Sequence, residues 1–162
     1  MRHEVQTSPL SHSRRVLLLG GAAIATAAAV QAWAGTSGNK ITVYKTPTCG
    51  CCSAWIEHLK ASGFEAQIMN RPDLAPIRAR FGAPVDLRSC HIATTGRYVI
   101  EGHVPAISIK KLLASKPDAV GVFVPGMPLG SPGMESPYKG QPYEVILLQK
   151  SGVREVFDRY EV

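Results

Sequence analysis

The chain lacks a hydrophobic run long enough to span a membrane, and it lacks a basic segment interleaved with aromatic residues. Its longest apolar stretch, residues 16–30, is shorter than the roughly 20 residues that a spanning helix needs. Aromatic residues make up only 7% of the 162 residues, and the formal net charge of +6 is scattered. No internal repeat is present. These absences argue against a repeat protein and against nucleic-acid binding, and they favour one globular domain.

The N-terminal segment has the pattern of an export signal. Arg14–Arg15 precede the weakly hydrophobic run 16–30, and residues 32–34 form an A-x-A cleavage site. We therefore expect residues 1–34 to be a cleaved signal and residues 35–162 to form the mature domain, with no membrane span. The arginine pair and its surroundings also resemble a twin-arginine signal, and a general secretory signal is the alternative.

Cysteine is scarce, and three of the four cysteines lie together. Cys49, Cys51 and Cys52 follow a short β-like run, residues 41–44, and precede a segment with helical spacing of apolar residues, 53–62. The cysteines are thus predicted at a strand-to-helix turn. The unpaired N–H groups and the dipole at a helix N-terminus favour ionised thiols, which bind metals or attack disulfides.

Two chemistries compete for this turn. Cys49 and Cys52 form a C-x-x-C pair, typical of a thioredoxin-like redox site. Cys51 is a third thiol, which invites scrambling in a redox switch but suits a soft metal such as Cu(I). A zinc site of four cysteines would want a second C-x-x-C pair, which the chain lacks. A structural disulfide within the triplet would close almost no loop, so only a bond to Cys90 would constrain the fold.

The rest of the sequence predicts a single α/β domain. After the first strand and helix, apolar periodicity and turn residues predict strands at 64–69, 91–95, 98–101, 120–124, 143–149 and 153–160, helices at 73–81 and after Pro105, and one more turn at 85–89. The helix after Pro105 is expected to bury Ile107, Ile109, Leu112 and Leu113. We expect a thioredoxin-like fold with a parallel βαβ unit, an inserted β-hairpin, and the cysteine turn at the carboxyl end of the first strand.

A long segment rich in proline and glycine, residues 124–142, forbids regular structure and carries Met127 and Met134. Methionine often fills irregular gaps under loops. The alternative is that both thioethers face the cysteine turn. A thioether is a soft, neutral donor that suits Cu(I) and suits zinc poorly, so methionines facing the turn would indicate copper.

The remaining candidates are one cysteine and three histidines. Cys90 is either a small buried apolar residue or a metal ligand, and we favour the ligand. His103 precedes a helix, where it could be a ligand, a cap or a surface residue. Strand alternation would point His91 away from Cys90. His58 lies seven residues past Cys51 on the helix and is the weakest candidate.

Four spaced motifs, T-P-T-C-G-C-C, S-C-H, E-G-H-V-P and V-P-G-M-P-x-G-S-P-G-M, together resemble the CopG-type copper-resistance proteins. The resemblance covers residues 40–160. It implies a periplasmic, thioredoxin-like, copper-binding domain of a Gram-negative bacterium, occurring with copper or silver efflux and tolerance systems. Matched by motif position, the implied copper ligands are Cys49, Cys51, Cys52 and Cys90, with His103, Met127 and Met134 as further candidates.

The sequence therefore predicts a periplasmic copper-binding protein of copper resistance that holds Cu(I) in a sulfur-rich site. Its expected partners are copper ions and periplasmic efflux or chaperone proteins. Two alternatives stay open. One is a thiol–disulfide oxidoreductase with Cys49 and Cys52 as its redox pair, and the other is an enzyme that interconverts Cu(I) and Cu(II).

Overall fold

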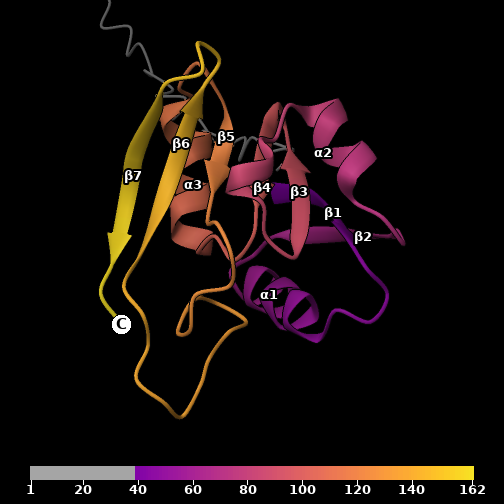
Figure 1. Cartoon of the computed structure of the whole chain (residues 1–162), viewed down its shortest axis with the longest axis vertical. Coiled ribbons are helices and arrows are strands. Elements are labelled where there is room, and N and C mark those ends of the chain that lie inside the picture. Colours follow the sequence, from indigo (N-terminus) through magenta and orange to yellow (C-terminus); the bar gives the residue numbers. More distant parts are fainter. Residues whose placement is uncertain (1–38) are drawn as a thin grey trace, which may run out of the picture. The chain divides into compact units, whose positions relative to one another are not determined.

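The computed structural model describes residues 39–162, which form one seven-stranded mixed sheet with three α-helices (Figure 1). The elements in chain order are β1 (Lys40–Lys45), α1 (Gly50–Ala61), β2 (Glu65–Asn70), α2 (Ala75–Phe81), a 3-10 turn (Val85–Leu87), β3 (His91–Thr95), β4 (Tyr98–Glu101), α3 (Ala106–Ser115), β5 (Ala119–Phe123), β6 (Tyr143–Gln149) and β7 (Arg154–Tyr160). The predicted mixed α/β architecture is confirmed. The predicted export signal, residues 1–34, lies outside the described residues.

The strands are ordered β2-β1-β3-β4-β5-β6-β7 across the sheet. Strands β1 and β2 are parallel, as the predicted βαβ unit requires, and β4 and β5 are also parallel. The other neighbours are antiparallel, including the two predicted hairpins β3–β4 and β6–β7. Because β1 is an inner strand, its carboxyl end and the turn that follows it lie beside β3, which pairs with β1 on the other side from β2.

Helices cover both faces of the sheet. Alternation along β3 sends Ala93 into the core cluster that contains Trp55 of α1 and Ile109 of α3. Its neighbour Ile92 belongs to a second cluster, into which Ile77 of α2 packs. Side chains of successive strand residues point to opposite faces, so α1 and α3 pack on one face and α2 on the other.

Helix α3 differs from the prediction at one position. Ile109 and Leu112 are fully buried, but Ile107 is 70% exposed, so its assignment to the apolar face is wrong. At 3.6 residues per turn, two positions correspond to about 200° around the helix, which places Ile107 opposite Ile109. Buried Ser108 takes the inner position instead, and its hydroxyl donates to Asp158 Oδ2 (2.6 Å) and lies 2.7 Å from the Tyr160 hydroxyl.

The segment between β5 and β6 contains no helix or strand, as predicted. It is ordered by its own backbone hydrogen bonds, in which Gly130 N donates to Met134 O (2.9 Å), Met134 N to Ser131 O (2.8 Å) and Gln141 N to Leu129 O (2.8 Å). Ser131 is completely buried. Within residues 39–162, no helix is long and apolar enough to cross a membrane.

Candidate metal centre

The cysteine turn joins β1 to α1. Helix α1 begins at Gly50, so Cys49 is its N-cap residue and Cys51 and Cys52 lie in its first turn. Cys49 makes no side-chain capping hydrogen bond, and the first turn carries no acidic residue. The cysteine sulfurs are therefore the side-chain atoms that can carry negative charge at this helix N-terminus. Buried Lys45 stabilises the turn, because its Nζ donates a hydrogen bond to Thr46 O at 2.9 Å.

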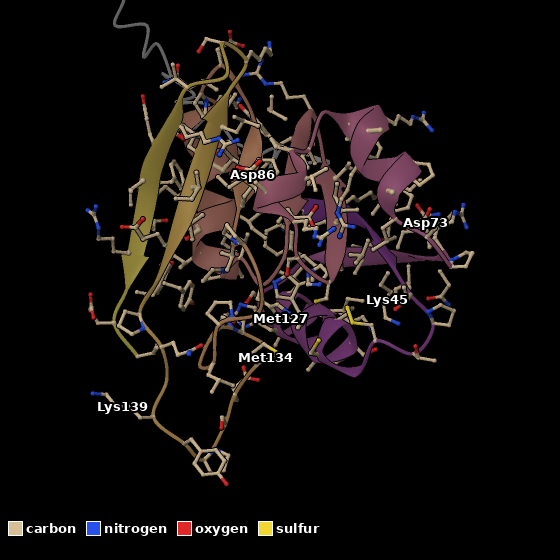
Figure 2. The ribbon with its side chains drawn as sticks, viewed as in Figure 1. Lys45, Asp73, Asp86, Met127, Met134 and Lys139 are labelled. Carbon is tan, nitrogen blue, oxygen red and sulfur yellow. A yellow bond between two sulfur atoms is a disulfide. The ribbon has the colours of Figure 1, made fainter. Side chains whose placement is uncertain are left out.

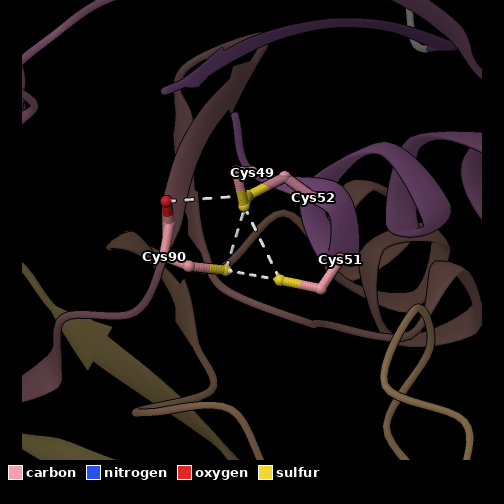
Figure 3. Close-up of side chains that lie close together, drawn as sticks. All are labelled: Cys49, Cys51, Cys52 and Cys90. Carbon is pink, nitrogen blue, oxygen red and sulfur yellow. Dashed lines mark hydrogen bonds between the residues drawn. A yellow bond between two sulfur atoms is a disulfide. The ribbon is translucent and has the colours of Figure 1, made fainter. Parts of the chain in front are cut away.

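All four cysteine sulfurs converge, although Cys90 comes from the segment before β3 (Figure 3). The Sγ atoms lie within 4.8 Å of one another. Cys52 Sγ and Cys51 Sγ lie 3.5 Å and 3.7 Å from Cys90 Sγ, and Cys49 and Cys51 are 3.6 Å apart. Four soft donors this close could share one metal ion or bridge several.

Cys49 and Cys52 form a disulfide, whereas Cys51 and Cys90 are free thiols. The bonded pair is the C-x-x-C pair of the redox alternative, whereas the copper interpretation expects four thiolates. The role of the four cysteines as metal ligands stays a prediction. The bond spans only three positions of the chain, so it constrains the unfolded state little and is a poor staple. It joins the two sulfurs that the C-x-x-C spacing predicts as a redox pair.

Cys90 lies against two buried histidines. His103 Nε2 is 3.1 Å from Cys90 Sγ, and His103 Nδ1 is 2.8 Å from Pro132 O. A carbonyl oxygen can only accept, so Nδ1 carries the hydrogen and Nε2 is left to accept from the Cys90 thiol. Burial, together with the charge of Cys51, raises the pKa of Cys90 to about 12, which keeps that thiol protonated at neutral pH when no metal is bound.

His91 is the site residue that the sequence argument misplaces. Its Nδ1 lies 3.3 Å from Cys90 Sγ, and its ring centroid is 4.3 Å from that of Trp55. The alternation rule fails because β3 begins at His91, so Cys90 lies before the strand. Burial holds the pKa of His91 well below its ordinary value, and among the described residues its Nε2 has no hydrogen-bond partner. Adjacency to Cys90 was the only signal for it.

The proline- and glycine-rich loop reaches the cysteine turn. Gly133 lies so close to α1 that a Cβ there would be 2.8 Å from Cys51 O and 2.6 Å from Trp55 N. The loop also meets the segment that carries Cys90, because Gly126 N donates to Arg88 O at 3.0 Å. The two methionines lie next to these contacts in sequence, on the loop where Figure 2 labels them.

The methionines differ in exposure. Met127 is 51% exposed, and Met134 is partly buried. Their role as thioether ligands stays a prediction.

A buried ion pair that no local sequence pattern predicts holds the segment that carries Cys90. Arg78 of α2 donates through Nε (3.0 Å) and Nη2 (2.8 Å) to Glu101 Oε1 of β4. The same two side chains hold the backbone of Ser89, whose N–H donates to Glu101 Oε1 (2.7 Å) and whose carbonyl accepts from Arg78 Nη2 (2.7 Å). We call this set the Ser89 clamp. It holds both the N–H and the carbonyl of Ser89, the residue that precedes Cys90.

Comparisons with known proteins show the family to which this chain belongs. Residues 87–134 match a family model described as "Protein of unknown function, DUF411". Two solved structures, titled "Copper resistance protein copG", Form 1 and Form 2, are each 41% identical with a TM-score of 0.72. They cover 76% and 75% of this chain and 98% and 97% of their own chains. The chain belongs to the CopG copper-resistance family. No match was found among curated proteins.

In this CopG-family chain, His58 has a structural role. Its Nε2 accepts a hydrogen bond from Ala106 N (3.1 Å), the first residue of α3. Burial lowers the pKa of His58, which keeps the imidazole in the neutral form that can accept. His58 is the weakest ligand candidate in the sequence, and in the structure its Nε2 is occupied by this hydrogen bond. His103, by contrast, lies against Cys90 and belongs to the site.

Proposed function

We propose that this CopG-family protein binds Cu(I) in the periplasm as part of copper resistance. The observation that carries the proposal is the convergence of the four cysteine sulfurs within 4.8 Å. Thiolate ligands suit soft metals, among them Cu(I), zinc and iron–sulfur clusters. The titles of the two solved relatives, which name copper resistance, support copper over other thiophilic metals.

The proposed ligand set is supported by the contacts of the cysteines and His103 and, for the methionines, by their place on the loop. Cys51 and Cys90 are free thiols, and two-electron reduction of the disulfide would make Cys49 and Cys52 available as well. His103 offers Nε2 beside Cys90, and Met127 and Met134 are the thioether candidates on the loop. Because thiols lose their protons on binding Cu(I), we expect affinity to fall as the pH falls.

We further propose that the core is thioredoxin-like and that the protein is exported. The neighbour order β2-β1-β3-β4, with β1 and β2 parallel and a C-x-x-C pair after β1, supports the fold. The arginine pair and A-x-A site in residues 1–34 support cleavage to a mature domain, residues 35–162. Periplasmic copper efflux or chaperone proteins are the partners that such a location and cargo would require.

One observation favours a second candidate, a thiol–disulfide oxidoreductase. The disulfide joins Cys49 and Cys52 at the N-terminus of α1, where a released thiolate is stabilised by the helix. An enzyme of this class would reduce a disulfide in a model protein with Cys49 as nucleophile. Cys51 and the loop methionines would then be dispensable.

The test is an anaerobic Cu(I) titration of fully reduced protein against a chromophoric Cu(I) chelator, beside an insulin-reduction assay. We expect stoichiometric copper binding that Cys51→Ser and Cys90→Ser weaken at least tenfold, and little insulin reduction. Ser53→Ala, on the exposed side of the same turn, is the matched control and should bind as the parent protein does. Binding of zinc but not copper would refute the proposal. Insulin reduction that survives Cys51→Ser would favour the oxidoreductase.

A further inference from the structure

The disulfide has a free thiol beside it that comes from a distant part of the chain. Cys90 Sγ is 3.5 Å from Cys52 Sγ, one of the two bonded sulfurs, although 38 positions separate the residues (Figure 3). This separation is close to van der Waals contact. Exchange needs the attacking sulfur on the extension of the bond that breaks, and Cys90 Sγ also lies within 4.8 Å of Cys49 Sγ, so Cys90 must shift around Cys52 before it attacks. Cys51 Sγ lies 3.6 Å from Cys49 Sγ, the other end of the disulfide.

The Cys90 thiol also has a proton acceptor in place. His103 Nδ1 donates its hydrogen to Pro132 O, which leaves the lone pair of Nε2 facing Cys90 Sγ at 3.1 Å. This contact places an acceptor for the thiol hydrogen beside Cys90. It does not ionise the thiol in advance, because burial raises the pKa of Cys90. Cys51 has no histidine nitrogen within hydrogen-bond distance among the described residues.

We propose that Cys90 opens the Cys49–Cys52 disulfide by intramolecular thiol–disulfide exchange. The Cys90 Sγ–H proton passes to His103 Nε2 as the Cys90 sulfur bonds to Cys52 Sγ. The Cys49–Cys52 bond breaks, its electron pair stays on Cys49 Sγ, and Cys49 then takes a proton while His103 returns its own to solvent. One disulfide and two free thiols exist before and after, so the step needs no oxidant or reductant.

The positions of the sulfurs explain the direction of attack and its result. Cys52 is fully buried with its Sγ beside Cys90 Sγ, whereas Cys49 is partly exposed and is the N-cap residue of α1, without a side-chain capping hydrogen bond. A thiolate released on Cys49 gains the field of the helix N-terminus, which makes it the better leaving group. Exchange thus moves the free thiol from Cys90, beside His103, to Cys49 at the N-terminus of α1, and both residues are partly exposed. This step uses the cluster that we propose to hold copper, but it does not depend on copper.

Peptide mapping tests the step directly. Trypsin should release residues 46–60, which contain the whole Cys49–Cys52 disulfide, and residues 89–97, which contain Cys90. Oxidised protein, freed of metal with a chelator, is incubated with N-ethylmaleimide, quenched with acid and digested. Exchange converts a bond within one peptide into a bond between two peptides, with the reagent on Cys49. We expect this cross-linked pair to accumulate with time.

Variants separate Cys90 from the other thiols. Cys51→Ser should still form the cross-link, which would show that Cys51 is not the attacking thiol. Cys90→Ser should leave Cys49 unmodified by the reagent. His103→Gln should slow the cross-link about tenfold or more, as expected on loss of a proton acceptor. The double variant C49S/C51S retains only Cys52 and Cys90, and mild oxidation should join them even if exchange in the parent protein is slow.

The proposal is overturned if the reagent modifies only Cys51 and Cys90 of the parent protein and leaves the Cys49–Cys52 bond intact. It is also overturned if Cys90→Ser exposes Cys49 at the parent rate, or if C49S/C51S stays unbonded. None of these outcomes bears on Cu(I) affinity, because no copper is present. Conversely, a failed copper titration would leave the exchange result standing.

Discussion

Removal of Arg78 should damage the site from a distance, because the Ser89 clamp depends on it. The side chain of Glu101 is 1% exposed and that of Arg78 is 15% exposed, so the pair is buried. In Arg78→Met the carboxylate of Glu101 would keep only the Ser89 N–H as a partner. Burial already raises the pKa of Glu101 even with Arg78 present, so a charge left there alone is costly.

The magnitude follows from burial. Removing one partner of a buried pair typically costs 3–5 kcal/mol, and the partial exposure of Arg78 places this case near the lower end, at about 3 kcal/mol. For a domain of this size, that loss lowers the melting temperature by about 10 °C. A matched control is Arg154→Met, since Arg154 pairs with Asp86 on the surface, with side chains 44% and 62% exposed. Solvent screens an exposed pair, so Arg154→Met should lose much less stability than Arg78→Met.

Urea denaturation of the oxidised, metal-free variants at pH 7 measures both losses. The double variant R78M/E101Q removes the buried charge but keeps an amide oxygen for Ser89 N–H, so it should be more stable than R78M alone. We also expect R78M to weaken Cu(I) binding in the reduced protein, because Ser89 precedes Cys90. Equal losses for R78M and R154M, or no recovery in the double variant, would refute the role assigned to the Ser89 clamp.

Two further predictions concern pH and the loop. Burial lowers the pKa values of His58, His91 and His103 below their ordinary value of 6.5. The unfolded chain therefore binds more protons below pH 6.5, and the free energy of unfolding should fall from pH 7.5 to pH 5.5 in urea titrations; a flat profile would contradict the assignment. Gly133→Ala should cost more stability than Gly126→Ala and should also weaken Cu(I) binding. Both glycines have positive φ (84° and 70°), but only Gly133 is crowded by α1, so equal losses would show that this contact does not matter.

Local patterns in the sequence were sufficient for most of the fold. Hydrophobic periodicity and turn residues placed the strands and helices to within a few residues, because each element here obeys its own local pattern. Ile107 shows the limit of that approach, since an apolar residue near the start of a short helix does not reveal which side of the helix the core occupies. Only the packing of α3 on the sheet settles it, with Ser108 turned inward.

The candidate site was less accessible to sequence reasoning, because it is made by contacts between distant segments. The Cys49–Cys51–Cys52 turn could be recognised locally, and a role for Cys90 could be suspected. The proximity of His91 to Cys90 depends on where β3 begins, which no pattern fixes to one residue. Arg78 and Glu101 come from α2 and β4 and look like ordinary surface charges in the sequence. The disulfide depends on the distance between two sulfurs rather than on their spacing alone.

The buried hydroxyl of Ser108 bears on how small a functional fragment of this protein can be. It fastens α3, the helix that follows His103, to Asp158 and Tyr160 of the last strand. A shortened version ending before β7 would leave that hydroxyl without either partner and would open one flank of the helix to water. A shortened version of the domain should therefore keep the C-terminal hairpin β6–β7, although this hairpin contributes no cysteine to the site.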